Sequence, residues 1–145
     1  MKRITVLLAD DNTFMRKVFR GILDREEDFE VVGEAIDGCQ AVAMVKELRP
    51  ALVLMDLTMP ALDGVQATRQ ILEAVPTTKV LMLSGHHEKE YVEAATTSGA
   101  MGYLIKESSL ESVCAGIREV YNGNAVFSPS IPAHLHKLSP QTAEH

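Results

Sequence analysis

Short apolar runs alternate along the chain with longer segments in which apolar residues recur every three or four positions. The runs are rich in Val, Leu and Ile, and most are apolar at every position, which is typical of strands in a parallel sheet covered by helices on both faces. One run, residues 30–35, is more polar, and we expect it to form an edge strand. The five predicted strands are residues 4–9, 30–35, 51–55, 79–83 and 102–105.

Five segments that follow these runs have the period of an amphipathic helix. Two of them end just before a proline, which disfavours the helical conformation of the residue preceding it. The fourth segment, residues 87–98, is the weakest, and we place its apolar face at Tyr91, Ala94 and Ala95. The other four are marked by Phe14, Val18 and Ile22, by Val42, Val45 and Leu48, by Val65, Thr68, Leu72 and Val75, and by Leu110, Val113, Cys114, Ile117, Val120 and Tyr121.

The last helix has signals for both of its ends. Ser108 and Glu111 are spaced as a capping box at its start, and Gly123 is a C-cap candidate. Five strands that alternate with five helices predict an α/β fold with a doubly wound, five-stranded parallel sheet.

The chain has 145 residues, which is a typical length for one domain. All the predicted strands and helices lie in residues 1–123, and we expect these residues to form that domain. Residues 124–145 have a different character, with three of the six prolines. We interpret residues 124–132 as a linker, and Ile131, Leu135 and Leu138 mark either one short helix or no regular structure.

Composition narrows the classes of function. Acidic residues outnumber basic ones by 20 to 14, and the resulting net charge of −6 argues against nucleic-acid binding by this chain alone. No apolar run approaches the roughly 20 residues that cross a membrane. Cys39 and Cys114 are isolated from each other and from histidines, which disfavours a zinc site and is typical of reduced thiols. We therefore expect a cytoplasmic protein with no membrane partner.

Residues with reactive side chains stand where the predicted strands end. The first strand is followed by Asp10 and Asp11, the third by Asp56, and the fourth and fifth by Ser84 and Lys106. Taken singly, each has a plainer interpretation as a helix cap, a turn residue or a solvated charge. Together they favour a site, because open parallel sheets bind ligands at the carboxyl ends of their strands.

The chemistry of this set points to phosphate. Neighbouring carboxylates repel one another unless a cation is present, and a few hard oxygen ligands suit Mg²⁺. A divalent cation, an ammonium and a hydroxyl together can hold the oxygens of a phosphoryl group. A carboxylate can also act as the nucleophile and form an aspartyl phosphate. Asp56 is the candidate, because it ends a fully apolar, central strand.

Five motifs, in order and at matching spacing, resemble the receiver domain of two-component response regulators. The resemblance covers about residues 1–123 and implies a flavodoxin-like fold with strand order 2-1-3-4-5. The motifs are VLLADD at 6–11, LVLMDLTMP at 52–60, DG at 63–64, VLMLSG at 80–85 and GAMGYLIK at 99–106.

The resemblance implies roles for the acidic residues and the lysine. Asp56 accepts a phosphoryl group from a sensor histidine kinase, and Lys106 neutralises the phosphoryl oxygens. Asp11, Asp56 and the backbone carbonyl of Thr58 hold Mg²⁺, and Asp10 helps through a bound water.

The resemblance also implies a switch. Phosphorylation draws the hydroxyl of Ser84 toward the new oxygens, and Tyr103 turns inward into the vacated space. The face formed by the fourth and fifth helices then changes shape.

Three features depart from the family pattern. Glu107 follows the lysine where proline is common, and the cis preference of an X–Pro bond is therefore absent. Gly85 replaces a common alanine and suggests a looser switch loop. His86 and Thr58 occupy positions that affect the lifetime of the phosphoryl group in this family.

The end of the chain resembles the NarL/FixJ subfamily, whose members continue into a helix-turn-helix DNA-binding domain. Residues 116–131 are similar to its last receiver helix and linker, and residues 138–140 are similar to the start of that domain. We expect a piece cut from a longer regulator. The alternatives are a regulator without an effector domain and a chance similarity in a disordered tail.

The leading hypothesis is a Mg²⁺-dependent phosphorylation switch that is not an enzyme acting on an outside substrate. Its expected partners are a sensor histidine kinase and, after phosphorylation, a second copy, with DNA bound only through an effector domain. The alternatives are a stand-alone receiver that acts through protein contacts, an Asp-nucleophile phosphatase and a flavin-binding protein. Thr58 disfavours the phosphatase, because a second acid is expected there, and the acids of residues 10–13 disfavour a flavin phosphate.

Overall fold

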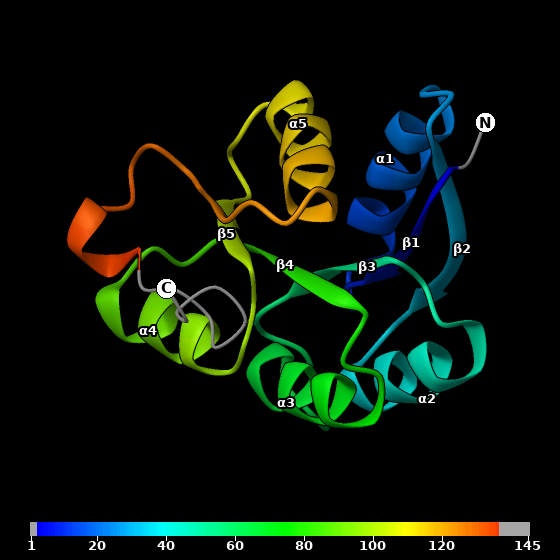
Figure 1. Cartoon of the computed structure of the whole chain (residues 1–145), viewed down its shortest axis with the longest axis horizontal. Coiled ribbons are helices and arrows are strands. Elements are labelled where there is room, and N and C mark those ends of the chain that lie inside the picture. Colours follow the sequence, from blue (N-terminus) through cyan, green and yellow to red (C-terminus); the bar gives the residue numbers. More distant parts are fainter. Residues whose placement is uncertain (1–2, 137–145) are drawn as a thin grey trace.

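A computed structural model describes residues 3–136, which form one parallel sheet with helices on both of its faces (Figure 1). The first five strands have the order β2-β1-β3-β4-β5, which confirms the flavodoxin-like topology. In chain order the elements are β1 (Ile4–Ala9), α1 (Thr13–Asp24), β2 (Phe29–Ala35), α2 (Gly38–Leu48), β3 (Leu52–Asp56), α3 (Gly64–Ala74), β4 (Lys79–Ser84), α4 (Lys89–Thr97), β5 (Gly102–Ile105), α5 (Leu110–Tyr121), β6 (Val126–Phe127) and the 3₁₀ turn η1 (Ala133–Leu135).

The helices divide the core into two layers. Helices α1 and α5 cover one face of the sheet, and α2, α3 and α4 cover the other (Figure 1). Side chains of β1 alternate between the layers, with Val6 and Leu8 on the α1–α5 side and Leu7 and Ala9 on the α2–α4 side. This double burial explains the continuous apolar runs, and the more polar run forms the edge strand β2 as predicted.

The prediction of five strands is wrong by one, because β6 pairs with β5 and completes a six-stranded sheet. Two residues are too few to produce a periodic signal in the sequence. The close approach depends on Gly102, where a Cβ atom would lie 2.4 Å from the carbonyl oxygen of Val126.

The segment that we interpret as a linker packs against the domain. Ile131 and Leu135 are buried in the core on the α2–α4 side, and η1 lies beside α4 (Figure 1). The short helix suggested by the apolar spacing is thus a single 3₁₀ turn, and Leu138 lies outside the described residues. A linker role for this segment in a longer protein stays a prediction.

Two local predictions about helices are wrong. In α4 the buried residues are Val92, Ala95 and Thr96, so Ala95 is buried as predicted, but Tyr91 is exposed because the buried face is rotated by about one residue from the one that we expected. In α5 the N-cap is Ser109, whose hydroxyl accepts a hydrogen bond from the N–H of Ser112. Gly123 follows that helix with a φ of 92°, a conformation that glycine favours.

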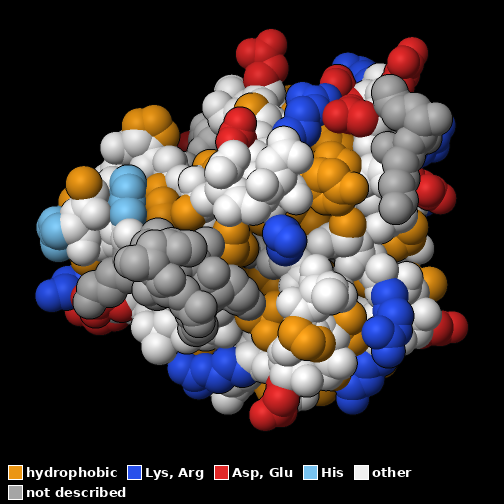
Figure 2. Space-filling model, in the orientation of Figure 1, with side chains coloured by type: hydrophobic (Ala, Val, Ile, Leu, Met, Phe, Trp, Pro, Cys, Tyr) orange, Lys and Arg blue, Asp and Glu red, His pale blue; other side chains and the backbone are white. Residues whose placement is uncertain are grey.

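Charged residues of both signs lie on the surface, as the composition of the chain leads us to expect. Figure 2 shows charged side chains of both signs along the rim and also on the face of the molecule, with apolar side chains exposed between them. Among residues 3–136, no helix combines the length and apolarity needed to span a membrane.

Helix α3 begins directly against the end of β3, and this contact depends on Gly64. A Cβ atom at this position would lie 2.3 Å from the backbone oxygen of Asp56. We predict that Gly64→Ala lowers the free energy of unfolding by about 1–3 kcal/mol, because the backbone of β3 or α3 must move apart. The control is Gly21→Ala in α1, where a Cβ atom meets nothing within 4 Å.

The two alanines are expected to act in opposite directions. Gly21→Ala should raise stability by up to about 1 kcal/mol through helix propensity alone. Urea unfolding followed by circular dichroism measures both. Equal effects of the two substitutions would contradict the close packing of α3 on β3.

Candidate functional site

The register of the sheet brings the predicted site residues together. Ala9 of β1 pairs with Met55 of β3, which places Asp10 and Asp56 side by side at the carboxyl end of the two central strands. Ser84 is the last residue of β4 and pairs with Ile105 of β5, directly before the predicted lysine. The expectation that these strand ends share one edge is therefore confirmed.

Three carboxylates form an acidic cluster at this edge. Asp10, Asp11 and Asp56 each offer one oxygen atom, and these atoms all lie within 4.8 Å of one another. Asp10 and Asp56 are buried, whereas Asp11 is exposed. None of the three acts as a helix cap, since Asn12 and Asp63 cap the two helices that follow.

The ammonium of Lys106 partly neutralises this cluster. Its Nζ lies 3.2 Å from Oδ2 of Asp10 and 3.4 Å from Oδ1 of Asp56. Three ionised carboxylates and one ammonium leave a formal charge of −2. Such a set of oxygen donors fits a divalent cation.

Burial and crowding change the proton affinities at this site. Burial, followed by repulsion from Asp10, raises the pKa of Asp56 to about 6, although Lys106 and the backbone N–H of Thr58 oppose the rise. Burial tends to lower the pKa of Lys106, but attraction from Asp56 and Asp10 outweighs it and keeps this pKa above its usual value. Ionisation of Asp56 therefore costs more free energy in the folded protein than in the unfolded chain.

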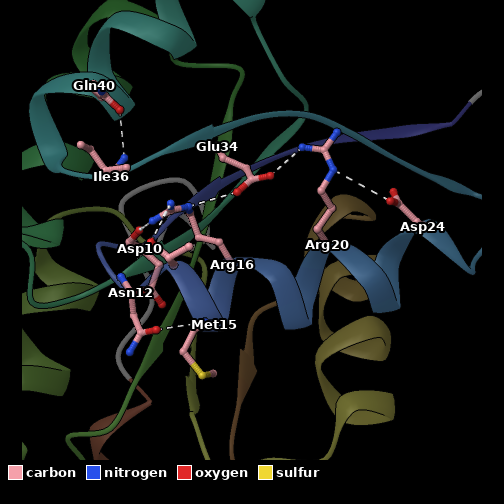
Figure 3. Close-up of polar contacts among 10 residues, drawn as sticks. Asp10, Asn12, Met15, Arg16, Arg20, Asp24, Glu34, Ile36 and Gln40 are labelled. Atoms are coloured by element: carbon pink, nitrogen blue, oxygen red, sulfur yellow. Dashed lines mark hydrogen bonds and ion pairs between the residues drawn. The ribbon is translucent and has the colours of Figure 1, made fainter.

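The backbone at Asp10 is held by groups that the sequence did not single out. Arg16 donates from Nη1 to the backbone oxygen of Asp10 at 2.6 Å and from Nε to Glu34 at 3.1 Å (Figure 3). Arg20 donates to the other oxygen of Glu34 at 2.7 Å, and these two arginines, Arg20 first, lower the pKa of that carboxyl. The side chain of Asp10 is fixed as well, because its Oδ1 accepts a hydrogen bond from the N–H of Asn12 at 2.9 Å.

Ser84 and Tyr103 meet at the backbone of His86. The hydroxyl of Ser84 accepts a hydrogen bond from the N–H of His86 at 3.0 Å, and the hydroxyl of Tyr103 donates to the His86 carbonyl at 2.6 Å. Tyr103 is 0% exposed, and its burial raises the pKa of the phenol. The inward position that the resemblance associates with phosphorylation is therefore the one this structure shows.

Two further predictions concern the loops around the site. Thr58 lies two residues beyond Asp56 and donates its N–H to that carboxylate, while the role of its carbonyl as a metal ligand stays a prediction. All peptide bonds of residues 3–136 are trans, including the one between Lys106 and Glu107.

Comparisons with known proteins found a matching family model and curated relatives. A family model described as the response regulator receiver domain matches residues 6–118. The transcriptional regulatory protein DegU of Brevibacillus brevis is 36% identical over 135 residues, which are 93% of this chain and 57% of DegU. The response regulator protein VraR of Staphylococcus epidermidis is 37% identical over 141 residues, which are 97% of this chain and 68% of VraR.

A solved structure of a response regulator has a similar fold. A two-component response regulator of the LuxR family from Aurantimonas sp. SI85-9A1 superimposes with a TM-score of 0.87 at 30% identity, over 93% of this chain and 96% of that one. The chain spans 57% of the length of DegU and 68% of the length of VraR.

The raised pKa of Asp56 predicts a pH-dependent gain of stability from Asp56→Asn. The folded state raises this pKa from 3.8 to about 6, so it binds the proton more tightly than the unfolded chain does. The stability contributed by the protonated carboxyl is present below the lower value and is lost as the pH rises through the higher one. At pH 7 the asparagine variant should therefore be more stable by on the order of 2–3 kcal/mol.

This difference should vanish as the pH falls from 6 to about 4. Urea unfolding followed by circular dichroism measures it, since the chain has no Trp. Asp37→Asn is the matched control, because asparagine replaces aspartate as an N-cap with little loss. Mg²⁺ should reduce the difference in stability between the variant and wild type, because it binds the folded wild-type protein, which keeps all three carboxylates, and not the unfolded chain. A gap that does not depend on pH would contradict this account.

The contacts of Arg16 predict that Arg16→Met destabilises the protein by about 1–2 kcal/mol, because the Asp10 carbonyl and Glu34 lose a charged donor. The stabilisation by Mg²⁺ should also decrease, since the carbonyl belongs to a residue of the acidic cluster. Lys17→Met removes the same charge from the next, exposed position and should change neither quantity. Equal effects of the two variants would show that only net charge matters.

Proposed function

This chain belongs to the response regulator receiver domain family, and we propose that it is a phosphorylation switch with Asp56 as the phosphoacceptor. One observation carries the proposal, namely the environment of that carboxylate. Asp56 is buried at the end of a central strand, next to two further carboxylates and 3.4 Å from the ammonium of Lys106. An isolated structural aspartate has no need of such neighbours.

In the proposed step, an oxygen of Asp56 attacks the phosphorus of a phosphohistidine on a sensor histidine kinase. The oxygen–phosphorus bond forms as the nitrogen–phosphorus bond breaks, and the electron pair of the broken bond stays on the imidazole. The ammonium of Lys106 then neutralises a phosphoryl oxygen, and Ser84 supplies a hydroxyl at the end of β4. The protein is modified once per transfer and does not turn over an outside substrate.

The acidic cluster fits Mg²⁺, because its donors are hard oxygens and its formal charge is −2. We propose Asp11, Asp56 and the carbonyl of Thr58 as ligands, with Asp10 acting through a water molecule. When bound, the ion neutralises charge on the phosphoryl oxygens.

The switch then acts through Ser84, His86 and Tyr103. Their hydrogen bonds link the end of β4 to β5, so a displacement of the serine hydroxyl toward the phosphoryl oxygens changes what the His86 backbone and the phenol can bind. We propose that this changes the surface formed by α4, β5 and α5, where a second copy or another partner binds.

We further propose that the output is transcription regulation. DegU is named a transcriptional regulatory protein, and this chain spans 57% of its length. A net charge of −6 makes DNA contact by the receiver itself unfavourable, so DNA binding is assigned to an effector domain outside these residues. A stand-alone receiver that acts by protein contacts is the alternative.

The test is phosphorylation by acetyl phosphate with Mg²⁺, followed by intact mass. The wild-type chain should gain one phosphoryl group, and the gain should be lost in Asp56→Asn and after Mg²⁺ is removed by a chelator. Asp37→Asn is the control and should be phosphorylated like wild type. Uptake that persists in Asp56→Asn would refute the assignment, and steady release of phosphate without a phosphorylated intermediate would indicate a phosphatase.

A further inference from the structure

The residues from β6 to the end of η1 pack against the rest of the domain. The C-terminal segment, by which we mean residues 126–135, begins with β6 against β5 and ends with η1 against α4. Ile131 and Leu135 are only 2% and 3% exposed. His136 stacks on Phe127 with ring centroids 4.2 Å apart, and a nitrogen of its ring lies 2.8 Å from the Ile131 carbonyl.

Ser128 connects this segment to the turn that carries the lysine of the site. Its N–H donates to the carbonyl of Tyr103 at 3.1 Å, which continues the pairing of β6 with β5. Its hydroxyl accepts a hydrogen bond from the N–H of Ile105 at 2.9 Å and lies 3.1 Å from the hydroxyl of Ser108. One buried side chain therefore contacts both ends of the turn around Lys106.

The same turn is held from the opposite side by β4. The N–H of Lys106 donates to the carbonyl of Ser84 at 2.8 Å, and the N–H of Ser108 closes the turn on the carbonyl of Ile105 at 2.8 Å. Glu107, the exposed residue within the turn, does not restrict its own backbone as proline does. The position of the lysine thus depends on contacts from β4 and from the C-terminal segment.

We propose that Ser128 is a positioning residue for Lys106, and that docking of the C-terminal segment is thereby coupled to occupancy of the phosphoacceptor site. The inference rests on the proposed function of Asp56. Ser128 does not touch the phosphoryl group and acts through the backbone of Ile105. Coupling between two sites is reciprocal, so a phosphoryl group that fixes the ammonium also stabilises the docked segment.

This coupling gives the site an output within the chain itself. The C-terminal segment covers the free edge of β5 and part of α4, which belong to the surface expected to change shape. A partner that binds the edge of β5 must first displace the segment, and phosphorylation makes that displacement harder.

The test uses beryllofluoride with Mg²⁺ as the probe and isothermal titration calorimetry of the full chain. Ser128→Ala removes the hydroxyl, and we expect its affinity for the probe to fall about five- to tenfold, at the low end of typical coupling between sites. Ser128→Thr keeps a hydroxyl and should restore most of the affinity. Ser130→Ala is the control, because Ser130 is exposed in the same segment and should bind the probe like wild type.

A purely structural serine predicts a different result. Ser128→Ala would then lower the free energy of unfolding while its affinity for the probe stayed within twofold of wild type, and that outcome would overturn the proposal.

A second measurement needs no variant. In wild-type protein, the probe should slow hydrogen exchange at the amides of Ser128 and Ile131, which bond to the carbonyls of Tyr103 and Ser128. Unchanged exchange at both amides on saturation would refute the coupling, even if Ser128→Ala failed to fold.

Failure of this inference is distinguishable from failure of the proposed function. If wild type does not bind beryllofluoride, the phosphoacceptor assignment is wrong, and the coupling, which depends on that assignment, is wrong too. If wild type and Ser128→Ala bind it equally and Asp56→Asn does not, the assignment stands and only the coupling is wrong.

Discussion

The ammonium of Lys106 lies between the carboxylates of Asp10 and Asp56, at 3.2 and 3.4 Å, where three acids meet at the carboxyl edge of a parallel sheet. The charges do not balance, since one ammonium faces three carboxylates. Burial and repulsion raise the pKa of Asp56 to about 6, so the ionised site costs stability at neutral pH. The excess negative charge favours a divalent cation at this edge, which is the basis of the magnesium site that we propose.

Such a cluster persists only if the backbone beneath it is rigid. Asp10 follows β1 and Asp56 ends β3, which are hydrogen-bonded central strands, and Gly64 lets α3 pack closely on the end of β3. Arg16, held in turn by Glu34, binds the carbonyl of Asp10. The sheet and these contacts prevent the carboxylates from moving apart, although their repulsion favours that separation. The packing of the whole domain offsets the unfavourable electrostatic free energy.

The C-terminal segment brings the end of the described chain into the same system. Its apolar residues complete the core beside α4, and Ser128 bonds to the strand residue that precedes Lys106. A group that neutralises the lysine at one end of β5 therefore acts on backbone contacts at the edge of that strand. Under the proposed coupling, signal output depends on how tightly residues 126–135 are docked as well as on the surface formed by α4, β5 and α5.

Local patterns in the chain were enough to predict the parallel α/β class, the positions of the first five strands and the residues of the acidic edge, because apolar runs and the residues that end them are local signals. It did not determine the face of α4, since Tyr91 and Val92 fit a weak helical period equally well. Only the folded structure revealed the strand β6, the contact of Arg16 with Asp10 and the hydrogen bond that the N–H of Ile105 donates to the hydroxyl of Ser128. Each of these joins backbone or side-chain groups that no short-range pattern relates, and each depends on a distance that exists only after the sheet has formed.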